Sequence, residues 1–212
     1  MSVVTPPTKP RAADDRQVRA ELPLLGQPAP ERRDAARNRD AVLNAALRLV
    51  EANGACAVTM EAVAEAAGVG KGTVFRRFES RAGLMGAVLD HSESAWQNAV
   101  ISGPPPLGPG APPLERLRAF GRSRLDLNLR HADLIEAAIS SYGRSYAAYS
   151  FAAMHVRYLL TELGATGDLH LLTTAVLAPL EAEILRQHRA EGVGEERIIA
   201  GWDDLVRRIL AG

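Results

Sequence analysis

One stretch of the chain contains residue types that could bind phosphate, AAGVGKGTVFRRF at residues 66–78. Its core resembles the phosphate-binding loop of nucleotide-binding enzymes, in which backbone N–H groups surround the phosphates and a Ser or Thr hydroxyl meets magnesium. That loop needs Ser or Thr after its lysine, but Gly72 follows Lys71, and Glu65 stands where the first Gly is required. The preceding residues are helix formers in helical register, whereas the loop must follow a buried strand. The nucleotide-binding interpretation therefore has little support.

The same residues meet the requirements of a DNA-binding helix-turn-helix, which needs small residues where two helices meet, a Gly-containing turn and a basic second helix. Ala67, Gly68 and Val69 supply the close approach and the turn, and Val74 and Phe78 are spaced to bury against the long helix before it. The whole chain has 25 Lys and Arg against 25 Asp and Glu, so any attraction for nucleic acid must be local. Residues 70–81 provide it, with one anion, Glu79, and four cations: Lys71, Arg76, Arg77 and Arg81. An αα-hairpin with a solvated basic face is the alternative interpretation.

The spacing of apolar residues around this stretch predicts the helices that would support it. Apolar residues recur at helical intervals over 37–53, which predicts one amphipathic helix. Thr59 is expected to cap a short helix that ends at Gly68. After the turn we expect a second short helix, and then a long helix over 81–101 that Ser80 caps. The predicted order is long helix, short helix, turn, short helix, long helix.

Proline and glycine divide the remaining chain. Residues 1–30 are rich in proline with little periodicity, which predicts a flexible tail, and 102–113 predicts a loop between two helical halves. Beyond it, helical spacing and boundary glycines predict helices over 113–130, 133–141, 145–163, 168–191 and 195–210. Pro179 is expected to kink or divide the fourth of these. Few segments alternate as strands do, so the predicted fold class is all-α.

The stretch from Arg37 to Leu89 resembles the DNA-binding domain of the TetR family of bacterial transcriptional regulators. The resemblance rests on TMEAVAEAAGV, KGTVFRRF and SRAGL, and it covers roughly a quarter of the chain. It implies three N-terminal helices that bind DNA and a C-terminal helical domain for effector binding and dimerisation. The expected division is a tail at 1–30, a helix-turn-helix domain at 31–80 and an effector-binding and dimerisation domain at 81–212.

The resemblance also implies DNA contacts at particular residues. It places the Thr59 hydroxyl on a phosphate, the second short helix in the major groove and Arg81 as a clamp on the DNA backbone, while the upstream arginines could reach phosphates or the minor groove. The complete predicted set is Arg32, Arg33, Arg37, Thr59, Lys71, Gly72, Thr73, Val74, Phe75, Arg76, Arg77 and Arg81. The chain departs from the family pattern where Phe75 replaces a frequent Tyr, Arg76 a frequent His, and Gly83 an acidic partner for Ser80.

A recognition helix of this size contacts only a few base pairs, so specificity requires two copies of the chain. The two C-terminal helices carry apolar stripes suited to an intersubunit four-helix bundle. The stripe residues are Leu172, Val176, Leu177, Leu180, Ile184, Ile198, Trp202, Leu205, Val206 and Ile209. The alternative is that these stripes close the core of the monomer. The resemblance favours a homodimer through the two helices.

The stretch SYGRSYAAYSFAAMHVRY is the densest aromatic region of the chain. Apolar walls with a few phenol and imidazole groups are typical of small-molecule cavities between helices, although each residue taken singly is more often core. The predicted effector site consists of Trp96, Phe120, Tyr142, Tyr146, Tyr149, Phe151, Met154, His155 and Tyr158.

Catalysis is not expected, because the five histidines show no metal-ligand spacing and no nucleophile motif stands in a suitable context. We therefore expect no cofactor and no metal site. Cys56 cannot form an internal disulfide and is expected to be a small buried residue, and no signal peptide or membrane-spanning run is visible, which favours the cytoplasm. The sequence predicts a ligand-responsive repressor that binds a palindromic operator as a homodimer. The alternative is a helical ligand-sensing or interaction protein without effector-controlled DNA binding.

Overall fold

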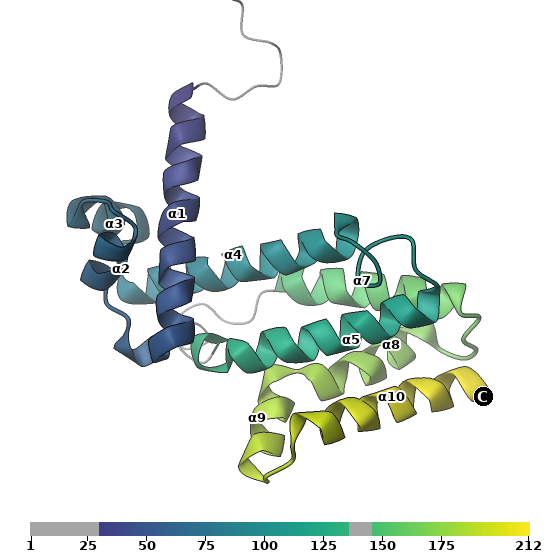
Figure 1. The fold of residues 1–212 in the computed structure, drawn as a ribbon. Helices are drawn as coiled ribbons and strands as arrows, with labels where there is room; N and C mark the ends of the chain where they lie inside the picture. The colour runs from purple at the N-terminus through teal and green to yellow at the C-terminus, as the bar shows by residue number, and fades with distance from the viewer. Residues whose placement is uncertain (1–29, 136–145) are drawn as a thin grey trace, which may run out of the picture.

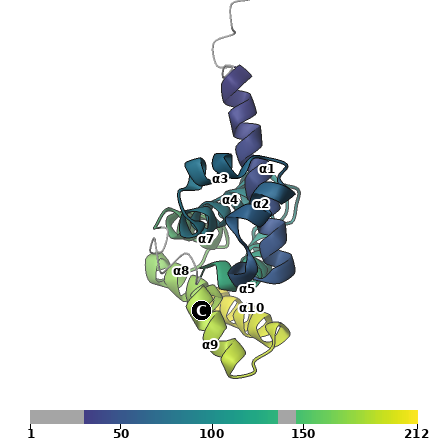
Figure 2. The ribbon, with the colours of Figure 1, turned by 90° about the vertical axis from the view of Figure 1, so that its left-hand side faces the viewer.

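The computed structural model describes residues 30–135 and 146–212, and every regular element in these ranges is a helix, as predicted. A first group of helices stands at one end of the molecule, and α4 leads from it into a second group whose helices run largely side by side (Figures 1 and 2). The first group comprises α1 (Pro30–Asn53), the 3-10 turn η1 (Ala55–Ala57), α2 (Met60–Ala66) and α3 (Lys71–Phe78). The remainder comprises α4 (Arg81–Ser102), α5 (Pro113–Arg130), α7 (Tyr146–Glu162), α8 (Leu169–Leu177), η2 (Ala178–Leu180), α9 (Ala182–Ala190) and α10 (Glu195–Ala211).

Two predicted helix caps are confirmed in the N-terminal group. The Thr59 Oγ1 accepts a hydrogen bond from the backbone N–H of Ala62 at 3.1 Å, and the Ser80 Oγ accepts one from Gly83 at 3.0 Å. Each bond satisfies a backbone donor that the first turn of a helix leaves without an intrahelical partner. The two caps therefore fix where α2 and α4 begin. In contrast, α1 begins at Pro30, one to two turns before the predicted residue 37.

The helix predicted over 168–191 is divided at Pro179, as expected. α8 ends at Leu177, η2 carries the proline, and α9 starts after Glu181, whose backbone is extended. Proline lacks the N–H that would continue the helical ladder, so the chain turns there and α9 runs steeply away from α8 (Figure 1). Of the helix predicted over 133–141, residues 132–135 are helical and residues 136–141 lie outside the described part of the chain.

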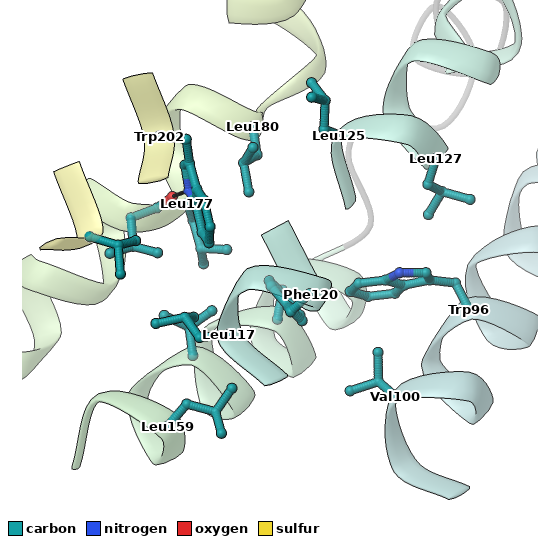
Figure 3. Close-up of a cluster of buried hydrophobic side chains, with 14 of the residues drawn as sticks. Trp96, Val100, Leu117, Phe120, Leu125, Leu127, Leu159, Leu177, Leu180 and Trp202 are labelled. Atoms are coloured by element: carbon teal, nitrogen blue, oxygen red, sulfur yellow. Dashed lines mark hydrogen bonds between the residues drawn. The ribbon is translucent and has the colours of Figure 1, made fainter. Parts of the chain in front are cut away.

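Two hydrophobic cores share α4. Its first half contributes Leu84, Met85 and Val88 to the core that α1, α2 and α3 form, and Leu134 joins the same core from beyond α5. Its second half contributes Trp96 and Val100 to the core of the C-terminal helices, where the Trp96 ring lies beside Phe120 of α5 (Figure 3). The predicted domain boundary at residue 80 remains a prediction, but the N-terminal core continues past it into α4.

The apolar stripes predicted for a dimer interface mostly close the core of the monomer. Six of the ten residues are buried within the chain itself: Val176, Leu177, Leu180, Ile198, Trp202 and Val206. The indole of Trp202 also donates a hydrogen bond to the carbonyl of Val176 at 2.8 Å, which joins α10 to α8. The prediction was wrong for these six because helical periodicity identifies an apolar face but not what covers it. The other four, Leu172, Ile184, Leu205 and Ile209, are partly or fully exposed.

Two further features of the described residues bear on the sequence predictions. Cys56 is exposed, so the expectation of a small buried residue was wrong; its neighbour Ala55 is buried in its place. None of the helices in residues 30–135 and 146–212 combines the length and the hydropathy that a membrane span needs.

Gly121 allows α5 and α10 to pack closely. A Cβ at this position would overlap ring atoms Cη2 and Cζ3 of Trp202. Both residues are buried, and Trp202 is held from its other side by the bond to Val176. The ring therefore has little room to move away from an added methyl group.

We expect Gly121→Ala to lower the free energy of unfolding by roughly 1–3 kcal/mol, because overpacking at this contact outweighs the gain in helix propensity. Gly201→Ala is the matched control, since it lies in α10 next to Trp202 with nothing within 4 Å of an added Cβ. It should be neutral or stabilising by up to about 1 kcal/mol. Urea unfolding at one protein concentration measures both variants, and equal stability of the two would contradict the packing argument.

Candidate DNA-binding surface and ligand cavity

The helix α3 presents one polar face to solvent. Lys71, Gly72, Phe75 and Arg76 are exposed along it, and Arg77 is exposed beside them. An added Cβ at Gly72 would meet nothing within 4 Å, so the backbone of α3 is open to close approach there. Three cations on one short exposed helix form a surface suited to phosphate and base edges.

The opposite face of α3 is buried, and this corrects the prediction for Val74. Val74 and Phe78 lie one helical turn apart, with 0 % and 6 % of their surfaces exposed, and both pack into the N-terminal core. A fully buried side chain cannot contact a base. Val74, which was predicted to face the groove, therefore holds α3 in place. Thr73, another predicted groove residue, is half-buried at the edge of the same face.

Arg81 is also corrected, because its side chain turns inward. Its Nε donates to the carbonyl of Val58 at 2.9 Å and its Nη2 donates to the carbonyl of Ala55. These carbonyls belong to the first residue of η1 and to its C-cap, Val58, which directly precedes the Thr59 cap of α2. The half-buried guanidinium therefore holds the start of the helix-turn-helix rather than clamping DNA, and its charge makes these hydrogen bonds stronger than neutral ones.

The chain has Gly83 where the TetR family often has an acidic residue, and the reason is steric. A Cβ there would overlap the carbonyl oxygen of Phe78, because Glu79, the C-cap of α3, has a positive φ of 61° and the chain returns tightly into α4. An acidic side chain at this position requires the backbone to shift. Ser80 therefore caps α4 without the reciprocal partner that a capping box would supply.

The upstream arginines are described only in part. Arg32 and Arg33 lie in the first turn of α1, but their side chains fall outside the described residues. Arg37 is exposed on α1. The guanidinium of Arg39 lies 5.7 Å from the ring centroid of Phe78, which brings a cation of α1 against α3.

A cavity of about 770 Å³ opens between α4, α5, α7 and the broken helix α8–η2–α9. Of the seven predicted effector residues whose side chains are described, Tyr149 alone is in its lining. The apolar part of its wall includes Leu127, Leu129, Ala152, Leu177, Leu180 and Leu185. These residues were not predicted to line a cavity. The one signal in the sequence was Pro179, because residues on both sides of the helix break at this proline line the cavity.

The aromatic cluster predicted as an effector site is mainly core. The rings of Trp96 and Phe120 lie 5.2 Å apart between centroids, and Phe151 stands edge-on to Trp96 at 6.0 Å. Met154 and Tyr158 point outward, with 56 % and 49 % of their surfaces exposed. Tyr142 lies outside the described residues, as does the side chain of Tyr146. Trp96, Phe120 and Phe151 pack in the core because the inner face of α7 meets α5 and α4 directly.

His155 stacks within this cluster, parallel to Phe151 with 6.3 Å between centroids. Burial and, to a lesser degree, the nearby positive charge of Arg116 lower the pKa of His155 from 6.5 to about 4. The imidazole is therefore neutral at physiological pH and serves as an aromatic packing group.

A partly buried ion pair forms part of the polar wall of the cavity. Arg124 of α5 donates two hydrogen bonds to the carboxylate of Glu93 on α4, at 2.7 and 3.0 Å, and its guanidinium lies 4.9 Å from the Trp96 ring centroid. Nearby, the side-chain amide of Asn128 donates to the carbonyl of Leu180 at 2.7 Å. These bonds satisfy polar groups that would otherwise be costly to bury.

His131 joins the cavity wall to α4. Its Nδ1 lies 3.2 Å from the Ser92 Oγ, while its Nε2 is buried without a hydrogen-bond partner among the described residues. Burial, then the charge of Arg130, lower the pKa of His131 below its ordinary value, so the ring is neutral. The next residue of α4 toward the N-terminus, His91, places its Nε2 3.0 Å from Asn44 Oδ1 on α1. Neighbouring residues of α4 thus contact the cavity wall and the DNA-binding domain.

No group of His, Cys, Asp or Glu in the described ranges has an arrangement that would hold a metal ion. The structure instead defines an all-α helix-turn-helix protein with a second helical domain around a cavity. Residues 42–88 match the family model of the TetR family of bacterial regulatory proteins. A TetR transcriptional regulator from Streptomyces coelicolor is 26% identical, with 82% of this chain and 97% of that chain covered and a TM-score of 0.54.

Other solved structures share this fold. A TetR-like regulator from a Rhodococcus species is 21% identical over 84% of this chain and 97% of its own, with a TM-score of 0.56. NalD of Pseudomonas aeruginosa, the secondary repressor of the MexAB-OprM multidrug efflux pump, is 17% identical over 85% and 97%, with a TM-score of 0.50. No curated protein sequence matches the chain significantly. Residues 42–88 are thus a TetR-family helix-turn-helix domain, in a chain with the fold of TetR-type transcriptional regulators.

We expect Arg81→Ala to lower the free energy of unfolding by roughly 1–3 kcal/mol, because two backbone carbonyls lose charge-assisted hydrogen bonds. Arg77→Ala removes an exposed cation from the same domain and should change stability by less than about 0.5 kcal/mol. Urea unfolding of both variants distinguishes the roles. Unchanged stability of Arg81→Ala would return this residue to the predicted role of a DNA clamp.

The neutral state of His155 predicts a loss of stability in acid. Its unfolded-state pKa of 6.5 exceeds the folded value of about 4, so the unfolded chain binds the proton first as the pH falls. Stability should therefore decrease between pH 6.5 and 4, by at most about 1.4 kcal/mol per pH unit from this group. His155→Phe should reduce that slope in unfolding measurements across this range, and an unchanged slope would show that other groups cause the loss.

Proposed function

We propose that the protein is a ligand-responsive transcriptional repressor that binds a palindromic operator as a homodimer and leaves it when a small molecule enters the cavity. The proposal rests chiefly on α4, where residues 90–93 contact both functional parts. Asp90 and Glu93 line the cavity, Ser92 faces His131 of the cavity wall, and His91 faces Asn44 of the DNA-binding domain. A ligand that alters this wall acts directly on the helix that supports α1 and α3.

The DNA contact is assigned to the exposed face of α3. Arg76 is the strongest candidate for base recognition, because its long side chain is exposed on the face that carries Lys71 and the open backbone of Gly72. An arginine reads guanine through two parallel hydrogen bonds in the major groove. Thr59 keeps a hydroxyl hydrogen for a phosphate while its oxygen caps α2.

A second connection between the cavity and the DNA-binding domain runs through residues 131–135. His131 and Ile135 line the cavity, while Leu134 between them is completely buried in the core of the helix-turn-helix domain. Displacing one side of this short segment moves the other. We propose that effector binding shifts the spacing of the two recognition helices in the dimer, and that the difference in effector affinity between the two states releases DNA.

Dimerisation is assigned to exposed surface of the broken helix and α10. Leu171 has 63% and Ile184 37% of its surface exposed, and Leu205 and Ile209 of α10 are partly exposed. Two recognition helices must stand about 34–36 Å apart to enter successive major grooves. NalD is a repressor, and this fold likeness is the reason for proposing repression here. As a DNA-binding regulator without a membrane-spanning helix in its described part, the protein would act in the cytoplasm.

We expect Arg76→Ala to weaken binding to the operator by about 5- to 150-fold, equivalent to about 1–3 kcal/mol, through the loss of a base contact. The measurement is fluorescence anisotropy with DNA from upstream of the protein's own gene, at fixed salt and with excess non-specific competitor. Arg157→Ala removes an exposed cation from α7 and serves as the control.

Equal affinities of Arg76→Ala and the parent chain would show that α3 is not the recognition helix. If the parent chain binds no specific sequence in a genome-wide selection, the alternative of a ligand-sensing or interaction protein without effector-controlled DNA binding replaces the proposal.

A further inference from the structure

We propose that the cavity takes a cationic amphiphile, with an ammonium group that donates to the Nε2 of His131 and an apolar body that lies against the leucine-lined wall. The regulatory role of such a ligand rests on the proposed function. Its chemical class is inferred from the cavity alone. Two independent features carry it: an unsatisfied buried nitrogen and an excess of carboxylates.

The nitrogen belongs to His131, which is 3 % exposed and lines the cavity. The ring is neutral, because burial and the charge of Arg130 lower its pKa. When Nδ1 donates its hydrogen to Ser92, Nε2 is left as an acceptor without a partner among the described residues. A buried acceptor without a donor is unfavourable, so a ligand N–H that reaches it recovers that loss.

The charges of the lining favour a cation. Among the described residues, five carboxylates and three guanidiniums line the cavity, a net formal charge of minus two with His131 neutral. Among the guanidiniums, Arg124 is already held by Glu93 and by the Trp96 ring, and Arg186 is paired with Glu183. The carboxylates that remain include Asp90 of α4 and Asp133 of the segment after α5, and both residues line the cavity. An ammonium group satisfies both the charge excess and the acceptor that His131 offers when Nδ1 carries the hydrogen, whereas a carboxylate would add to the charge excess.

The remaining wall selects an apolar body of moderate size. Leu127, Leu129, Leu177, Leu180 and Leu185 supply aliphatic surface, and Tyr149 supplies one ring. The volume of about 770 Å³ lies within the range of sites that hold drug-sized molecules. Burial of this body supplies most of the affinity, and the charged end supplies selectivity.

Titration calorimetry with three probes of equal chain length tests the charge preference: octylamine, octan-1-ol and octanoate, each below its micelle concentration. With the full chain at neutral pH, octylamine should bind at least about tenfold more tightly than octanoate, with octan-1-ol between them. Asp90→Asn combined with Asp133→Asn should reduce this preference and leave octan-1-ol binding unchanged. Glu196→Gln, an exposed acid on α10 outside the cavity, is the matched control and should change nothing.

His131→Phe tests the acceptor, since it keeps an aromatic ring in the wall and removes both nitrogens. His131→Phe should weaken the binding of octylamine and of octan-1-ol, while the thermal unfolding of the variant stays cooperative. If this variant does not fold, the double variant at the exposed Asp90 and Asp133 still tests the proposal. The proposal is overturned if octanoate binds as tightly as octylamine, if none of the probes binds, or if the double carboxylate variant keeps the full preference. These titrations contain no DNA, so failure of operator binding and failure of the ligand assignment are separate results.

Discussion

One continuous helix, α4, contributes side chains to both hydrophobic cores, and the rest of the structure depends on this arrangement. Leu84 and Val88 of α4 are buried among the helices of the helix-turn-helix domain, and Trp96 and Val100 are buried among the C-terminal helices. A helix held by its own backbone hydrogen bonds is stiff over this length, so neither core can move relative to the other without moving α4. The position of α3 on DNA is therefore tied to packing around the cavity.

The second link, through residues 131–135, restricts the possible motions further. Because Leu134 fills the N-terminal core while His131 and Ile135 line the cavity, the two domains are joined by this segment as well as by α4, which it contacts through His131 and Ser92. Two attachments resist independent rotation of the domains and favour a small number of packed arrangements. Such bistable packing converts a small displacement at a ligand into a change in helix spacing.

Local features of the sequence predicted much of the fold, and tertiary packing determined the rest. The caps at Thr59 and Ser80 and the break at Pro179 depend on residues a few positions apart, so their spacing in the sequence was sufficient. The burial of Val74 could also be predicted, from its spacing to Phe78. Arg81 needed a different kind of information, because bonding to carbonyls 23 and 26 residues away depends on the assembled domain. The cavity was missed for the same reason: its wall combines residues from five separate segments.

Although the chain has no net charge, it carries two local charges of opposite sign that differ in how many ionic contacts they make. The cations of α3 are exposed and act on phosphates through solvent, so binding there releases counterions and weakens steeply with salt. The cavity carboxylates Asp90 and Asp133 are exposed as well, but a single ammonium group makes fewer ionic contacts with them than a DNA backbone makes with several cations. Because salt dependence grows with the number of phosphates that are neutralised, rising salt weakens the hold on DNA more than the hold on a bound cation. The two sites remain coupled through α4 while differing in their response to the surrounding solution.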